Sequence, residues 1–168
     1  MNILIPSEEI QDKVIELASE INSNEVGNPI PKVFVCLLNG GFMFFSDLVK
    51  HIDFDFECDF MRVKSYVKKN EQGDINISKD LETPIKGKDV YIIDDIYDSG
   101  NTMEAVIDYL NVKQPHSITV VTLLTRSSSQ FPLYPSHVGF ILEDEWVVGY
   151  GMDDEDGFMR NKPDLYEI

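Results

Sequence analysis

Three carboxylates and a glycine turn follow an apolar run near the middle of the chain. Residues 90–102 read VYIIDDIYDSGNT, in which Asp94 and Asp95 follow the apolar run and Asp98 and Gly100 come shortly after. Adjacent carboxylates suit two tasks: accepting hydrogen bonds from vicinal sugar hydroxyls, and holding Mg²⁺ directly or through water. A further acid on the turn is free to accept a proton. The segment therefore predicts a site for a sugar, a metal ion and a proton transfer.

The turn that contains Gly100 also predicts an anion site. Glycine adopts a positive φ readily, and residues 99–102 lead into a helix expected over 102–113. Successive backbone amides at the positive end of a helix suit a phosphate. The alternative is an ordinary helix N-terminus with favourable acids. Acids before a helix are common, but a pair at the mouth of a buried strand plus a third on the turn favours the functional interpretation.

Hydrophobic periodicity predicts an α/β fold in which a parallel sheet is covered on both faces. Continuous apolar runs indicate buried strands, and segments with helical spacing alternate with them. Ligands of such folds bind beyond the carboxyl ends of the strands, where the turns after residues 38 and 93 would lie. The expected helices are 7–21, with Ser7 as its N-cap, 42–52 and 102–113, and the expected strands are 32–38, 56–66, 89–94, 117–125, 137–142 and 145–151.

Composition narrows the classes of partner. The chain has 168 residues, which suits one domain, and a formal net charge of −16. This charge opposes binding to nucleic acid or anionic lipid, and it requires that a phosphate ligand be met by a metal, by amides or by a few basic side chains. No apolar run is long enough to cross a bilayer, and the start lacks the features of a secretory signal. A cytoplasmic protein is expected, with Cys36 and Cys58 as reduced, buried thiols.

Other short motifs are absent or incomplete. A calcium loop starting at Asp94 would need an acid at Ile96, and a GxGxxG motif starting at Gly149 would need a glycine at Asp154. The polar segment 67–87 suits a mobile functional loop and an ordinary surface hairpin equally well.

Several segments resemble one known family. The sequence VYIIDDIYDSGNTM is similar to the phosphoribosyl diphosphate (PRPP) binding motif of type I phosphoribosyltransferases, and further segments resemble the hypoxanthine–guanine branch in the same order. The resemblance covers nearly the whole chain. It implies a single type I phosphoribosyltransferase domain over 1–168, with a mainly parallel sheet flanked by helices and a small hood formed by the termini. The further segments are PSEEIQDKVIELASEI (6–21), VCLLNGGFMFFSDLV (35–49), DFMRVKSY (59–66), VGFILEDEWVVGYGMD (138–153) and RNKPDL (160–165).

The resemblance implies purine salvage: transfer of 5-phosphoribosyl from PRPP to N9 of hypoxanthine or guanine, giving IMP or GMP and diphosphate, with Mg²⁺. A xanthine-preferring or atypical purine enzyme remains an alternative. A nucleotide-sensing regulator of the same fold is another, although the charge of −16 counts against nucleic-acid binding. A homodimer or homotetramer is implied, because members of the family usually form one or the other.

The resemblance also implies residue roles. Asp98 would be the general base near N7 of the purine, Trp146 would stack on the purine, and residues 67–80 would form a flexible loop that closes over the site. In the family, the turn that matches residues 38–40 often contains a non-proline cis peptide bond. PRPP would be bound by Asp94, Asp95, Asp98, Ser99, Gly100, Asn101, Thr102, Leu38, Asn39, Gly40, Ser65, Tyr66 and Arg160. The purine would be bound by Trp146, Val147, Asp153 and Thr125, and the metal by Asp94, Asp95 and Asp153.

Two positions depart from the family pattern. Thr125 stands where the family usually has a lysine that binds the purine 6-oxo group, and a threonine hydroxyl donates one hydrogen bond without charge. The alternatives are that Arg126 substitutes for this lysine or that a 6-oxopurine binds more weakly. The segment between Asp153 and Arg160 is one residue longer than the pattern. From the residues alone, Trp146 would be a core aromatic and Arg160 a surface residue.

Overall fold

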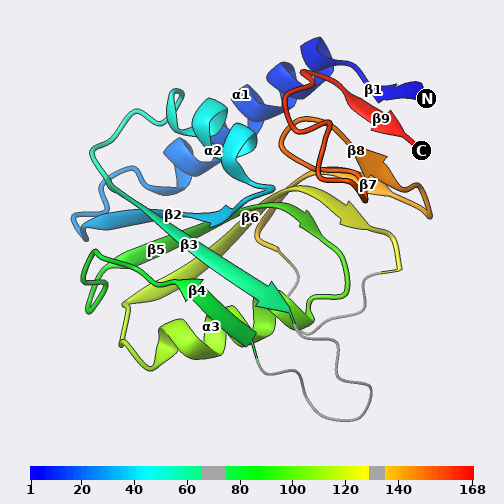
Figure 1. Cartoon of the computed structure of the whole chain (residues 1–168). Helices are drawn as coiled ribbons and strands as arrows, with labels where there is room; N and C mark the ends of the chain where they lie inside the picture. The colour runs from blue at the N-terminus through cyan, green and yellow to red at the C-terminus, as the bar shows by residue number, and fades with distance from the viewer. Residues whose placement is uncertain (66–74, 129–134) are drawn as a thin grey trace.

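The computed structural model describes residues 1–65, 75–128 and 135–168 (Figure 1). A six-stranded sheet runs in the order β4-β3-β2-β5-β6-β7. All neighbours in it are parallel except β4, which pairs antiparallel with β3. The mainly parallel α/β sheet that the sequence predicts is therefore confirmed. Its strands are β2 (Lys32–Leu38), β3 (Glu57–Ser65), β4 (Ile75–Lys79), β5 (Asp89–Tyr97), β6 (Ser117–Arg126) and β7 (His137–Leu142).

Helices cover both faces of this sheet. Helices α1 (Ser7–Asn24) and α2 (Phe42–Val49) lie on one face and α3 (Asn101–Asn111) lies on the other (Figure 1). Strand β2 shows why residues 33–38 are all apolar: Phe34 and Cys36 pack in the core beneath α1 and α2, whereas Val33 and Val35 pack in the core beneath α3. A strand buried on both faces reads as a continuous apolar run, which explains why its bounds were predictable.

A smaller antiparallel sheet, the hood, is built from both ends of the chain. Its order is β1 (Asn2–Ile5), β9 (Leu165–Glu167) and β8 (Val147–Val148). The implied hood is thus confirmed. The expected strand 145–151 is shortened to β8 because Gly149, Tyr150 and Gly151 have φ values of 98°, 46° and 102°, which a strand does not adopt. The sequence offered no comparable signal for β1 or β9.

The start of α1 corrects one prediction. Ser7 is the first helical residue and not the N-cap, which is Pro6, and no side chain of the cap residue bonds to the helix. The acceptor comes instead from the residue before β9 of the hood, Asp164, whose Oδ1 accepts the Ser7 N–H at 2.7 Å. A carboxylate at the positive end of a helix is favourable. This contact joins the hood to α1, one of the helices that cover the main sheet.

Two further expectations change. Strand β5 continues to Tyr97, so Asp94 and Asp95 lie within the strand and not after it. Residues 75–79 form β4, which pairs antiparallel with β3, as the surface-hairpin alternative for segment 67–87 predicts, while residues 67–74 lie outside the described residues. Cys36 is buried as expected, but Cys58 is exposed. Among the described residues, no helix is both long and apolar enough to cross a membrane.

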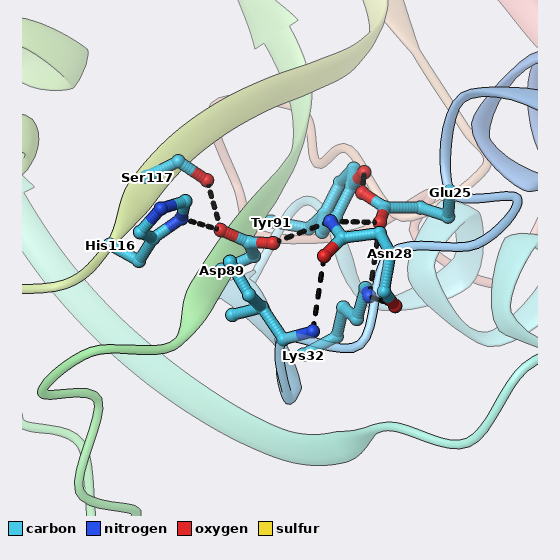
Figure 2. A network of polar contacts seen from close by, with 8 residues as sticks. Glu25, Asn28, Lys32, Asp89, Tyr91, His116 and Ser117 are labelled. Carbon is cyan, nitrogen blue, oxygen red and sulfur yellow. Dashed lines mark hydrogen bonds and ion pairs between the residues drawn. The ribbon is translucent and has the colours of Figure 1, made fainter.

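A buried polar network ties α1 to the amino-terminal ends of the strands (Figure 2). The carboxylate of Asp89 is 5% exposed. It accepts a hydrogen bond from Ser117 Oγ at 2.6 Å and one from Asn28 Nδ2 at 2.9 Å, and it lies 2.7 Å from His116 Nδ1. Asn28 also donates to Glu25 at 2.7 Å. The network therefore fixes the end of the sheet that lies opposite the acids at 94 and 95.

Asp89→Asn is expected to lower the free energy of unfolding at neutral pH by about 1–3 kcal/mol, the usual cost of a disrupted buried hydrogen-bond network. Burial alone would raise the pKa of Asp89, but the hydrogen bonds from Ser117, His116 and Asn28 lower it overall. A lowered folded-state pKa stabilises the protein above the unfolded pKa of about 3.9, and this stabilisation is lost as the pH falls through the folded value. Urea unfolding should therefore show the gap between wild type and variant narrowing below about pH 4. The exposed Asp55→Asn is the matched control, and an equal response in both variants would contradict the prediction.

Candidate active site

The paired acids Asp94 and Asp95 lie near the carboxyl end of β5. The Asp95 N–H donates to Asp94 Oδ1 at 3.0 Å. Burial raises the pKa of Asp94 well above its usual range, and the neighbouring Asp95 raises it further. Two crowded carboxylates that repel one another suit a divalent cation. Mg²⁺ is commonly held by one or two carboxylates together with substrate phosphates, so this pair fits the predicted metal.

The turn after β2 lies directly against the acid pair. The Leu38–Asn39 peptide bond is cis, as the family resemblance led us to expect. A Cβ on Gly40 would lie 1.9 Å from Asp95 Oδ2, and a Cβ on Gly151 would lie 2.2 Å from the Gly40 carbonyl oxygen. Only glycine fits such close approaches. The structure thus brings together the turn at 38–40, the acid pair and the segment after β8.

Arg160 reaches this group in spite of the extra residue before it. Its Nη1 donates to the Gly151 carbonyl at 2.7 Å, and its Nη2 lies 2.5 Å from Asp153 Oδ2. Asp153 is therefore paired with Arg160. Within the described residues, no cluster of three potential metal ligands forms. The metal and purine roles of Asp153, and the diphosphate role of Arg160, stay predictions.

The turn of residues 98–102 has the geometry of an anion site. Gly100 has the positive φ that its sequence context predicts, 77°, and it occupies the N-cap position of α3. Glycine has no side chain that could cap the helix from the N-cap position, and a helix leaves its first N–H groups without partners inside the helix. Ser99 and Asn101 are exposed. The turn can therefore offer backbone donors to a phosphate at a positive helix end.

The end of β6 carries the two residues that bear on base selectivity. Thr125 is fully buried, and its hydroxyl donates to the Tyr97 carbonyl at 3.1 Å. Arg126, the next residue, donates from Nε to Asp98 Oδ1 at 2.9 Å. The sequence named Arg126 only as an alternative to Thr125 and missed its pairing with Asp98. The available signal was its place at the carboxyl end of an expected strand, the edge of the sheet where ligands of such folds bind.

Trp146 is 61% exposed. The residue pattern alone had suggested a core aromatic, and the structure corrects this. Its carbonyl accepts the Ile168 N–H at 3.0 Å, which anchors it beside the hood, and Val147 begins β8 and is buried. Ser65 ends β3, whereas Tyr66 lies outside the described residues. The purine and PRPP roles of these four residues, 65, 66, 146 and 147, stay predictions.

Comparison with known proteins decides the family. A family model described as a phosphoribosyl transferase domain matches residues 6–155. The chain is 40% identical over 163 residues to the hypoxanthine-guanine phosphoribosyltransferase of Bacillus subtilis (strain 168), covering 96% of this chain and 89% of that protein. The chain belongs to the hypoxanthine–guanine phosphoribosyltransferase family. The resemblance seen in the sequence is thereby confirmed.

Two other comparisons agree with this assignment to the phosphoribosyltransferases. The hypoxanthine-guanine-xanthine phosphoribosyltransferase of Tritrichomonas foetus is 35% identical and covers 96% of this chain and 87% of that protein. A crystal structure of a hypoxanthine phosphoribosyltransferase from Staphylococcus aureus matches with a TM-score of 0.93 and 35% identity, covering 100% of this chain and 91% of that one. The type I phosphoribosyltransferase fold is thus shared over the full length of the chain.

Proposed function

We propose that this protein is a purine salvage enzyme that transfers the 5-phosphoribosyl group from PRPP to N9 of a 6-oxopurine, hypoxanthine or guanine, and releases diphosphate. The observation that carries the proposal is the meeting of the Gly40 turn, the acid pair and the Arg160 segment at one edge of the sheet. The named relatives of Bacillus subtilis and Staphylococcus aureus support the substrate class.

PRPP would be held by groups from three segments. The amides of residues 99–102 bind the 5-phosphate at the N-terminus of α3. The carboxylates of Asp94 and Asp95 accept hydrogen bonds from the ribose hydroxyls, and the guanidinium of Arg160 faces the diphosphate. Bound Mg²⁺, held by the acid pair, would neutralise charge on the diphosphate as it leaves. The Mg²⁺ requirement is itself part of the proposal.

The chemical step makes use of the acids. As the C1–O bond breaks, the ribose gains positive charge, which nearby carboxylates stabilise electrostatically. Asp98 accepts the proton that the purine loses as N9 attacks C1, while Trp146 stacks on the ring. Because the Thr125 hydroxyl is already donated to the Tyr97 carbonyl, Thr125 does not replace the family's lysine at the 6-oxo group.

A xanthine-accepting enzyme is the second candidate. The Tritrichomonas foetus relative carries xanthine in its name, and Thr125 stands where the family pattern has lysine. The single-domain organisation over 1–168, closure of residues 67–80 over the site, cytoplasmic location and a homodimer or homotetramer are also proposed. Sedimentation of the purified chain would measure the oligomer.

The decisive experiment is a panel of hypoxanthine, guanine, xanthine and adenine, each with PRPP and Mg²⁺, monitored for diphosphate release. Release with hypoxanthine or guanine, abolished by EDTA and restored by added Mg²⁺, is the expected result. A clear preference for xanthine would establish the second candidate. Absence of release with every base, or use of adenine alone, would refute the proposed function.

Trp146→Leu is expected to raise the KM for the purine by about 10- to 100-fold, because base–aromatic stacking contributes ~1–3 kcal/mol. PRPP affinity should stay unchanged, since the ring lies outside the groups assigned to PRPP. Steady-state kinetics with each substrate varied in turn measures both. The matched control is Phe158→Leu, which removes another exposed aromatic ring. An unaltered purine KM in the Trp146 variant would remove the stacking role.

A further inference from the structure

One guanidinium links two parts of the site that are distant in sequence. Arg126 ends β6, and its side chain is 14% exposed. Its Nε donates to Asp98 Oδ1 at 2.9 Å, while its Nη1 donates to the carbonyls of Glu145 at 3.0 Å and Glu143 at 3.3 Å. Asp98 lies on the turn before α3, and Glu145 immediately precedes Trp146. The side chain therefore bridges the proposed proton acceptor and the proposed stacking ring.

The turn at 143–145 depends on the end of β6 for its position. The Ser127 N–H donates to the Leu142 carbonyl and the Ser127 hydroxyl to Glu143 Oε2, each at 2.8 Å. These bonds hold the turn locally, but they do not reach Asp98. Arg126 makes that connection because a guanidinium carries five N–H donors in a rigid planar fork, whereas a lysine ammonium is a compact point charge.

The surrounding charge makes a cation at this position important. The two turns that Arg126 links, 98–102 and 143–145, contain four carboxylates in a chain whose net charge is −16. They belong to Asp98, Glu143, Asp144 and Glu145. Hydrogen bonds from a charged donor to a carboxylate are roughly twice as strong as neutral ones. Without the guanidinium, Asp98 would lose this bond, and the two carbonyls would lose their charged donor.

We propose that Arg126 is a positioning residue that fixes Asp98 and the segment leading to Trp146 relative to one another, so that both meet the same purine. The inference rests on the proposed function, because it assigns Asp98 and Trp146 to one substrate. It predicts that purine use and Trp146 order depend jointly on Arg126, and that PRPP binding does not.

The test is the variant Arg126→Met. The control is Lys113→Met, which removes a different ion pair beyond the C-terminal end of α3, between Lys113 Nζ and Asp80 Oδ2 at 3.1 Å. Trp146 is the only tryptophan, so acrylamide quenching of its fluorescence reports on this segment alone. Quenching should rise in Arg126→Met, kcat/KM for the purine should fall by about 10- to 100-fold, and the Kd for PRPP should stay within about twofold of wild type. The Lys113 variant should match wild type in all three.

Two further variants separate positioning from general loss of structure. Arg126→Lys should recover part of the lost turnover, because an ammonium can bond to Asp98 or to the carbonyls but not with the same fork. In the double variant Arg126→Met with Asp98→Asn, the loss should be smaller than the product of the two single losses, since the effects of residues that act together are not additive. Wild-type quenching in Arg126→Met, or a fully additive double variant, would overturn the proposal. If the wild type released no diphosphate with any of the bases, the proposed function would fail. The quenching comparison would still decide whether Arg126 holds the segment that leads to Trp146.

Discussion

Replacing Asp98 by asparagine is expected to leave PRPP bound and to slow turnover by about 10²–10⁴-fold, the usual contribution of a well-placed general base. The asparagine side chain has the same shape, and its amide oxygen can still accept the bond from Arg126. It cannot take a proton from the purine. The backbone amides of the turn are unchanged, so the anion site that Gly100 shapes should persist. Calorimetric titration with PRPP and steady-state kinetics would measure the two effects separately.

The matched control is Asp108→Asn, which changes an exposed acid on α3 far along the helix from the turn. It should retain wild-type turnover and PRPP affinity. Unchanged turnover in Asp98→Asn would remove Asp98 from the role of base, while a joint loss of turnover and PRPP affinity would show that the carboxylate serves mainly in binding.

Gly151→Ala is expected to disrupt the PRPP site and to lower the free energy of unfolding by roughly 2–5 kcal/mol. Two causes add. The φ of 102° is one that residues with a side chain rarely adopt, and the new Cβ would lie 2.2 Å from the Gly40 carbonyl oxygen. Because that oxygen belongs to the backbone, the turn at 38–40 must shift. This turn includes Gly40, which lies directly against Asp95 of the acid pair. Urea unfolding and PRPP titration would show both losses.

Gly157→Ala separates the two causes. Gly157 has a φ of 86°, but a Cβ there would meet nothing within 4 Å. This variant should therefore show the cost of backbone strain, about 1–3 kcal/mol, with PRPP affinity retained. Equal losses in the two variants would mean that the approach of Gly151 to Gly40 contributes nothing to stability.

The elements of the fold that were predictable are those whose burial leaves a pattern. Strand β2 matched its predicted bounds, 32–38, because both of its faces are buried. Strand β4 was covered only by the hairpin alternative, without bounds, because it is a polar edge strand whose pairing with β3 comes from the backbone. Strand β5 was predicted to end at Asp94 because the carboxylates end the apolar run. It continues to Tyr97 because the hydrogen bonds between strands are made by the backbone and do not depend on the side chain.

The candidate active site likewise has features that the sequence predicts and features that it does not. The positive φ of Gly100 followed from its turn context, and the cis bond at Leu38–Asn39 from the family resemblance. The pairing of Arg126 with Asp98 joins residues 28 positions apart. It requires knowing that β5 and β6 are neighbours in the sheet, which periodicity does not specify.

The hood has a consequence for how an active molecule is made. The register of β1 and β9 places Asn2 opposite Glu167, so forming this sheet closes a loop that contains the whole main sheet, and β1 cannot pair until β9 has been synthesised. A nascent chain would already carry the acid pair in β5 while lacking the segment that supplies Gly151 and Arg160. Catalytic competence should therefore appear only after β9 has been synthesised and has paired with β1.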